Sequence, residues 1–331
     1  MSPRAPTASA ECRLDGPLAG VRARAAGLDV GWMQEKIYGR PSARDAALEG
    51  SLAGPGGVSF IPCPPAAGGA IAGIQLWGVG GPGEVRPVPG GRLCEGRGWR
   101  MLHLASIGGG EGSPDGQARE MFERAAAAAR AHGFDYGDTV RTWIYLRRLL
   151  DVYDGFNAVR RAFYSRHRFR LGAFPASTGI QASLLSSECR MDALLVQGVP
   201  ASPIESTALQ GRASSYGSAF SRGVELAIDG RRTIHVSGTA SIGSAGQSLH
   251  RGDADGQCRE TLRSVAAVLA RRGAQLPDIV SATVFCKTPE VRSNFLRALE
   301  AFDVPELPAI YVVADVCRPE LLVEMEAVAV P

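Results

Sequence analysis

The stretch DGQARE at residues 115–120 recurs as DGQCRE at residues 255–260, and this repeat decides the fold. Each copy opens an alanine-rich segment. Three further pairs of landmarks follow in the same order: DTV at 138–140 and DIV at 278–280, PA at 175–176 and 308–309, and MDA at 191–193 and MEA at 325–327. The four offsets are 140, 140, 133 and 134 residues, so the order is kept while the loops differ. Such a repeat indicates one structural unit present twice, rather than one continuous sheet with accidental similarity.

Each copy alternates helix formers with β-branched and aromatic runs. The pattern predicts helices over 117–132 and 256–272, each followed by a glycine, and second helices over 152–166 and 290–302. Strands are expected at 140–146, 191–197, 280–286, 309–314 and 323–330, with a hairpin at Asp229-Gly230. Each half therefore follows the order β-β-α-β-α-β-β. We predict an α+β fold in which helices pack on one face of mixed sheets.

The chain of 331 residues is long enough for two such units and an additional segment. We expect an N-terminal extension with its first strands over 1–69, a first half over 70–202, and a second half over 203–331. Residues 1 to about 55 lack a firm hydrophobic period.

Composition narrows the class of protein. Charged residues make up 21% and the net charge is +3 without a basic run, which argues against nucleic-acid binding. The seven cysteines form no Cys-x-x-Cys pair, so we expect free thiols and no metal. The glycine-rich run at 108–112 lacks the lysine of a phosphate-binding loop, so no cofactor is expected. No apolar stretch approaches a membrane span and the opening segment lacks the apolar core of a secretory signal, which favours the cytoplasm.

One ionisable position differs between the two copies. Glu324 precedes the last landmark of the second copy, and Arg190 stands there in the first. A duplicated scaffold with one such difference suggests a single site between the two units. Glu326 lies two residues further along the same expected strand, so both carboxylates should share one face.

The second half resembles the RidA/YjgF family. Phe220-Ser221-Arg222, Val236-Ser237-Gly238-Thr239 and the 323–327 strand match that family's motifs. In that family an arginine follows the Pro-Ala pair, whereas Ile310 stands here. This departure argues against the ordinary imine hydrolysis of the family.

From about residue 70 onward the chain is more similar to the chorismatases, which combine a RidA-like fold with release of pyruvate from chorismate. The matching segments are residues 141–146, 156–163, 175–180, 237–242 and 312–318. The resemblance implies a cofactor-free enzyme with Glu324 as general acid. Burial is the usual means of keeping such a carboxyl group protonated. Cys317 resembles the cysteine found at this position in chorismatases that form 3-hydroxybenzoate.

Further residues are expected to bind the substrate. Arginine suits the two carboxylates of chorismate because its guanidinium group forms paired hydrogen bonds. Arg141 and Tyr145 should share a strand face, and Arg222 should lie beside the site; Arg160 is a weaker candidate because a helical arginine usually faces solvent. The remaining candidates are Thr178, Gly179, Phe220, Ser221, Gly238 and Thr239.

Several alternatives stay open at this point. A hydrolytic chorismatase would give the dihydroxycyclohexadienoate, and a related enzyme a mixture of 3- and 4-hydroxybenzoate. A non-catalytic RidA-like module would bind a metabolite without converting it. The histidines His103 and His235 occupy equivalent positions in both copies, which favours a structural role. The oligomer is expected to be a monomer or a homotrimer.

Overall fold

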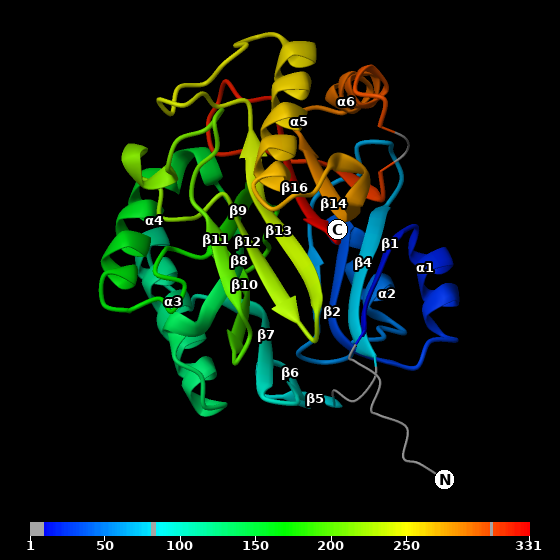
Figure 1. Cartoon of the computed structure of the whole chain (residues 1–331), viewed down its shortest axis with the longest axis vertical. Helices are drawn as coiled ribbons and strands as arrows, with labels where there is room; N and C mark the ends of the chain where they lie inside the picture. Colours follow the sequence, from blue (N-terminus) through cyan, green and yellow to red (C-terminus); the bar gives the residue numbers. More distant parts are fainter. Residues whose placement is uncertain (1–9, 81–83, 305–306) are drawn as a thin grey trace.

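The computed structural model describes residues 10–80, 84–304 and 307–331, and it contains three β-sheets (Figure 1). The expectation of no secretory signal rests on the opening segment. Residues 1–9 of that segment lie outside the described residues. Among the described residues, no helix is both long and apolar enough to cross a bilayer.

The first half forms a six-stranded sheet in the order β5-β6-β7-β10-β8-β9. Its elements are β5 (Glu84–Val88), β6 (Gly91–Gly96), β7 (Trp99–Gly108), α3 (Pro114–Ala131), β8 (Thr139–Leu146), α4 (Leu149–Tyr164), β9 (Ala176–Gln181) and β10 (Cys189–Gln197). Strands β8 and β9 are parallel, and the other neighbours are antiparallel. Helix α3 begins where Ser113 accepts a hydrogen bond from the Gly116 backbone, a common N-cap.

The second half repeats this sheet in the order β11-β12-β13-β16-β14-β15. Its elements are β11 (Ala201–Ile204), β12 (Gly223–Ile228), β13 (Arg231–Ala240), α5 (Ala254–Ala270), β14 (Ile279–Cys286), α6 (Val291–Ala301), β15 (Ala309–Val313) and β16 (Val323–Ala329). The α+β class with two tandem halves of the same topology is therefore confirmed.

The N-terminal segment has the same topology in a shorter form. Its sheet order, β1-β4-β2-β3, matches β7-β10-β8-β9 and β13-β16-β14-β15, with β2 and β3 parallel like the corresponding pairs. The elements are β1 (Ala10–Gly16), α1 (Leu18–Ala25), β2 (Val30–Gly39), α2 (Arg44–Leu48), β3 (Val58–Ile61) and β4 (Ile71–Gly80). The sequence indicated only an extension ending at residue 69, whereas strand pairing also includes β4. The chain thus contains three related units, named here first, second and third in chain order.

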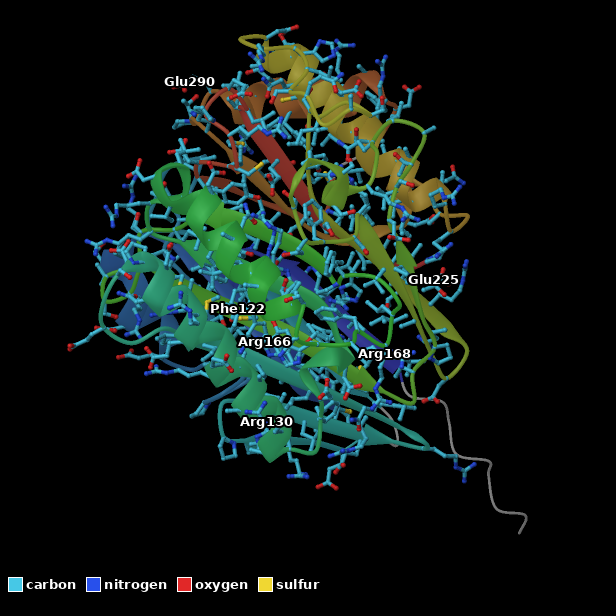
Figure 2. The ribbon with its side chains drawn as sticks, turned by 90° about the vertical axis from the view of Figure 1, so that its left-hand side faces the viewer. Phe122, Arg130, Arg166, Arg168, Glu225 and Glu290 are labelled. Atoms are coloured by element: carbon cyan, nitrogen blue, oxygen red, sulfur yellow. The ribbon has the colours of Figure 1, made fainter. Side chains whose placement is uncertain are left out.

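The three sheets enclose a common core, and each carries its helices on its outer face (Figure 1). The inner faces contribute Tyr38, Tyr145 and Phe285, one from each unit, to the shared core. Outside the second sheet, Phe122 of α3 stacks on Phe163 of α4 at 5.1 Å between ring centroids. Figure 2 shows Phe122 beneath the helices, whereas the side chain of Arg130 extends away from the molecule.

The second and third units meet where β9 lies beside β12 and β13. A bridge joins Ala176 to Ser221, and the Ser177 backbone N–H donates to the Ser237 hydroxyl at 2.9 Å. The sheets diverge beyond these contacts, so side chains from both units can line one hollow.

Candidate active site

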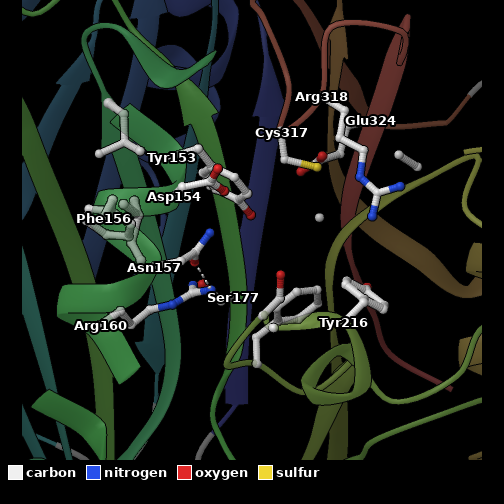
Figure 3. A pocket seen from close by; sticks show the side chains of 18 of the residues that line it. Tyr153, Asp154, Phe156, Asn157, Arg160, Ser177, Tyr216, Cys317, Arg318 and Glu324 are labelled. Carbon is white, nitrogen blue, oxygen red and sulfur yellow. Dashed lines mark hydrogen bonds between the residues drawn. The ribbon is translucent and has the colours of Figure 1, made fainter. Parts of the chain in front are cut away.

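A cavity of about 390 Å³ lies at the seam between the second and third units (Figure 3). The second unit contributes β8, β9 and one face of α4, and the third contributes β13, β16 and two loops. Seven of the predicted site residues line it: Arg160, Gly179, Phe220, Arg222, Gly238, Cys317 and Glu324.

Glu324 of β16 is the buried acidic group of this cavity, and the exposed Asp154 of α4 also lines it. Its side chain is only 4% exposed and makes no hydrogen bond or ion pair with another described residue. Its carboxyl group lies against Gly238, where a Cβ atom would overlap Oε1. Burial, reinforced by the nearby negative charge of Glu326, raises the pKa of Glu324 to about 8. The group is therefore mainly protonated at neutral pH, although Arg141 and Arg222 oppose this shift.

Cys317 lies beside Glu324, as Figure 3 shows. Burial and the neighbouring Glu324 charge raise the pKa of this thiol to about 12, even though Arg318 and Arg222 act in the opposite direction. Cys317 is thus a neutral thiol at physiological pH. It can donate a weak hydrogen bond and fill space, but it is a poor nucleophile in this state.

Two buried guanidinium groups line the cavity. Arg222 is 1% exposed; it donates to the Gly211 carbonyl and, at 2.6 Å, to the Tyr216 hydroxyl. Arg160, on α4, is 3% exposed and donates to the Asn157 side chain at 2.7 Å. The expectation that Arg160 faces solvent is wrong. The loop of the third unit that carries Tyr216 and Arg222 covers this face of α4, and Arg161 is bonded to it through the Gly217 carbonyl at 2.6 Å.

Sequence reasoning missed several lining residues. Tyr153, Asn157 and Arg160 are spaced by four and three residues on α4, so they share one face. Because Arg160 was already a candidate, this helical spacing could have indicated Tyr153 and Asn157 as well. Tyr216 and Arg318 complete the opposite wall, and the Arg318 guanidinium lies 5.7 Å from the Tyr216 ring centre. Ser177, rather than Thr178, faces the cavity.

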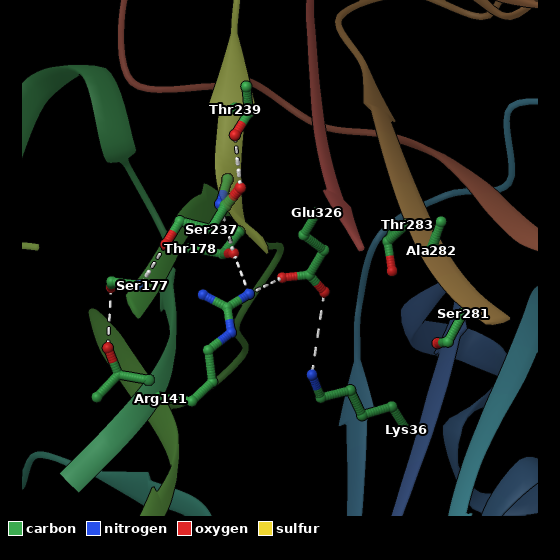
Figure 4. A network of polar contacts seen from close by, with 12 residues as sticks. Lys36, Arg141, Ser177, Thr178, Ser237, Thr239, Ser281, Ala282, Thr283 and Glu326 are labelled. Atoms are coloured by element: carbon green, nitrogen blue, oxygen red, sulfur yellow. Dashed lines mark hydrogen bonds and ion pairs between the residues drawn. The ribbon is translucent and has the colours of Figure 1, made fainter. Parts of the chain in front are cut away.

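Arg141 and Tyr145 share a strand face as predicted, but that face points into the common core and not into the cavity. Arg141 forms an ion pair with Glu326 at 2.7 Å and donates to Thr178 at 2.6 Å (Figure 4). Lys36 of the first unit lies 4.0 Å from the other Glu326 oxygen. Tyr145 is buried in the hydrophobic core. These side chains therefore form a polar network behind the site.

Three other predicted residues support the seam from behind. The Thr178 hydroxyl accepts a hydrogen bond from the Gly238 backbone N–H at 3.0 Å, which connects the network to the strand beneath Glu324. Ser221 donates to the Phe174 carbonyl at 2.6 Å, and Thr239 donates to the Ser237 carbonyl at 2.8 Å. None of these three side chains lines the cavity.

The two equivalent histidines lie away from the cavity, in keeping with a structural position. His103 contacts Gln34 at 2.7 Å, and burial together with the Lys36 charge lowers its pKa to about 3. Burial likewise lowers the pKa of His235 well below the usual range. Both rings are neutral at physiological pH. Besides the exposed Asp154, the cavity thus offers one buried, protonated carboxyl group, one thiol and several cations, which suits proton donation to a bound anion.

The three linked units define the fold class: the chain has a RidA/YjgF-like fold, with an acidic hollow between two units of one chain. A family model described as Endoribonuclease L-PSP matches residues 218–331. The crystal structure of a chorismatase superposes with a TM-score of 0.75 at 20% identity, covering 98% of this chain and 99% of that one.

The chain is also similar to a curated 3-hydroxybenzoate synthase of Streptomyces hygroscopicus. The two are 28% identical over 221 residues, which is 59% of this chain and 64% of the relative. The match therefore spans less than two thirds of that protein. Together these comparisons confirm the predicted resemblance to chorismatases and the RidA-like fold.

Proposed function

We propose that this protein is a chorismatase that converts chorismate to 3-hydroxybenzoate and pyruvate. The observation that carries the proposal is Glu324, a buried carboxyl group with a raised pKa that shares one cavity with several cationic side chains. The similarity to a 3-hydroxybenzoate synthase and the shared fold with a chorismatase support it.

The first step is transfer of the Glu324 proton to the methylene carbon of the enolpyruvyl group. The double-bond electrons take up this proton, and an oxocarbenium-like centre forms at the ether carbon. The neighbouring ring hydroxyl then attacks the carbon that bears the ether, so that a new C–O bond forms as the bond between the ether oxygen and the ring breaks and pyruvate leaves. Loss of one proton, which restores Glu324, and aromatisation of the ring then give 3-hydroxybenzoate. A general acid with a pKa near the working pH is suited to this transfer, and such groups typically contribute about 10²–10⁴-fold to rate.

Arg222 and Arg160 are the proposed ligands of the two substrate carboxylates. They lie on opposite walls of the cavity, one from each unit, and both are held by hydrogen bonds to neighbouring groups. Fixed guanidinium groups bind carboxylates without a large reorganisation. Arg318 and Tyr153 add a further cation and a hydroxyl group to the lining.

Cys317 is proposed to steer the product. The thiol fills space beside Glu324 that a hydrolytic water would need. Formation of 3-hydroxybenzoate consumes no water overall, because the two products together hold the atoms of chorismate. The hydrolytic route takes up one water and gives the dihydroxycyclohexadienoate instead. Excluding water therefore favours intramolecular rearrangement and aromatisation.

A pyruvate assay on chorismate, coupled to lactate dehydrogenase, tests the proposal, with mass identification of the aromatic product. The wild-type chain is expected to release pyruvate, and Glu324→Gln to lose at least about 100-fold in rate. Unchanged pyruvate release by Glu324→Gln would refute the role of Glu324. Binding of chorismate by the wild type without any pyruvate would instead favour the non-catalytic module.

A further inference from the structure

The three units create three seams, and the strand register identifies the position in each that corresponds to Glu324. Glu324 pairs with Phe285 of β14, Arg190 with Tyr145 of β8, and Gly73 with Tyr38 of β2. The three aromatic partners all lie in the common core. The equivalent position therefore carries a carboxyl group in the third unit (Glu324) and a guanidinium group in the second (Arg190). In the first unit it is Gly73, which has no side chain.

The seam that contains Gly73, between the third and first units, is closed. A Cβ atom at Gly73 would lie 3.0 Å from Ile310 Cγ1 and 2.9 Å from the Gly16 carbonyl oxygen. Ile310 is 2% exposed and occupies the space where a ligand would lie in the Glu324 seam. Only the remaining seam, between the first and second units, can hold a second ligand of this kind.

That seam contains a cavity of about 310 Å³. The second unit contributes Arg190 and the loop residues Leu184, Leu185 and Ser186, which precede β10 as residues 318–320 precede β16. The first unit contributes Phe60 of β3 and Pro62 directly after it, together with Arg44 at the start of α2 and Pro41 in the 3₁₀ turn that precedes α2. The elements that line this cavity thus correspond to those around Glu324.

The lining combines cations with apolar side chains. Arg190 makes no hydrogen bond or ion pair with another described residue, and its pKa is lowered by burial and by the nearby Arg44 charge, against the attraction of Asp192. Arg44 is half exposed, and its one ion-pair partner among the residues that the structure describes is the neighbouring Asp45, at 2.9 Å. Leu185 is 71% exposed, an unusual state for leucine in a concave site. Within the described part of the chain, no acidic residue lines this cavity.

We propose that this seam is a second binding site, which takes a small aromatic carboxylate. The carboxylate would pair with Arg190 and Arg44, and the ring would cover Phe60, Leu184 and Leu185. A carboxylate relieves the repulsion between the two guanidinium groups, and the apolar body gains free energy by leaving water. The site binds without catalysing proton transfer, because an arginine replaces the acid. The proposal does not depend on turnover of chorismate.

Titration calorimetry with 4-bromobenzoate on the full chain tests the site. Arg190→Gln is expected to weaken one binding event at least 10-fold, and Arg44→Gln about threefold. Arg44 is half exposed, so its variant remains informative if Arg190→Gln does not fold. Arg147→Gln, at an exposed arginine outside the cavity, is the matched control and should bind like the wild type. The uncharged 4-bromobenzamide and acetate should each bind at least 10-fold more weakly, since each lacks half of the recognised chemistry.

Crystals grown with 4-bromobenzoate locate the event through the anomalous signal of bromine. The proposal expects bromine between Arg190 and Leu185 in the wild type and its loss in Arg190→Gln. Bromine only in the Glu324 cavity would overturn it. Calorimetric curves for Arg190→Gln and Arg44→Gln that match the wild type would overturn it too, and any bromine at the seam would then mean binding at crystal concentration only.

Discussion

Glu324 and Glu326 project from the same face of β16, two residues apart, yet only Glu326 is paired with cations. Glu326 binds Arg141 at 2.7 Å and lies 4.0 Å from Lys36, whereas Glu324 has no such partner among the described residues. The negative charge of Glu326 helps to raise the pKa of Glu324, second to the effect of burial. One strand thus supplies both a structural anion and a proposed acid.

This relationship predicts the pH profile of the reaction. The pKa of Glu324 is raised to about 8, so the protonated, active form is lost as the pH rises through that value. We expect kcat/KM for chorismate to be flat near pH 7 and to fall about 10-fold per pH unit well above pH 8. Initial rates of pyruvate release between pH 6 and 10 measure this. A fall centred near pH 4.5 would contradict the proposed environment of Glu324.

Stability should respond in opposite directions to the loss of the two carboxylates. Glu324 titrates near 4.5 when unfolded and near 8 when folded, so its burial destabilises the protein increasingly from pH 4.5 up to pH 8. Glu324→Gln should therefore raise the free energy of unfolding by about 3 kcal/mol at pH 7, and the gain should vanish below pH 4. Glu326→Gln should lower it by about 3 kcal/mol, because buried Arg141 loses its partner. Urea unfolding at pH 4 and 7 tests both; equal effects of the two variants would argue against this assignment.

Cys317→Ala tests the control of the product. The smaller side chain admits water beside Glu324, so the product should shift from 3-hydroxybenzoate toward the dihydroxycyclohexadienoate while pyruvate release continues. Liquid chromatography of the aromatic products measures the ratio, and Cys286→Ala, at a buried thiol outside the cavity, is the control. An unchanged ratio would remove the steering role and leave the role of Glu324 intact.

Gly238→Ala should displace the acid. The added Cβ overlaps Glu324 Oε1, so the carboxyl group must leave its position and kcat should fall at least about 10-fold. Gly179→Ala is the matched comparison, because it lines the same cavity and its Cβ meets no atom within 4 Å. That variant should change KM more than kcat. Equal loss of kcat in both variants would show that crowding of the cavity, rather than the Glu324 position, matters.

The repeat made much of the fold predictable. Helices at 117–132 and 256–272 were predicted within a few residues of α3 and α5, since amphipathic helices with clear caps depend on local sequence. The first unit was not recognised as a third copy. Its β2 strand buries Gln34, Glu35 and Lys36, so no hydrophobic alternation marks it. Those polar groups are tolerated because each has a partner. His103 contacts Gln34 and Glu326 lies near Lys36, whereas Glu35 is bound by Arg22 and residues 51–53 of its own unit.

The site was predicted less completely than the fold. Periodicity correctly assigned Arg141 and Tyr145 to one face, but it could not indicate that this face turns toward the common core. Arg160 was expected in solvent because the loop that covers it comes from another unit, about 60 residues away in the chain. Contacts between units, rather than local pattern, decide both positions.

The joining of the three units in one polypeptide has a consequence for how the sequence can change. In a ring of identical subunits, any substitution is repeated at every interface, so a residue that improves one must be acceptable at all. Here a mutation at Glu324, Arg190 or Gly73 occurs once, so it changes one interface and leaves the other two as they were. A protein built in this way can keep one pocket reactive while substitutions close another pocket or change the ligand that it binds.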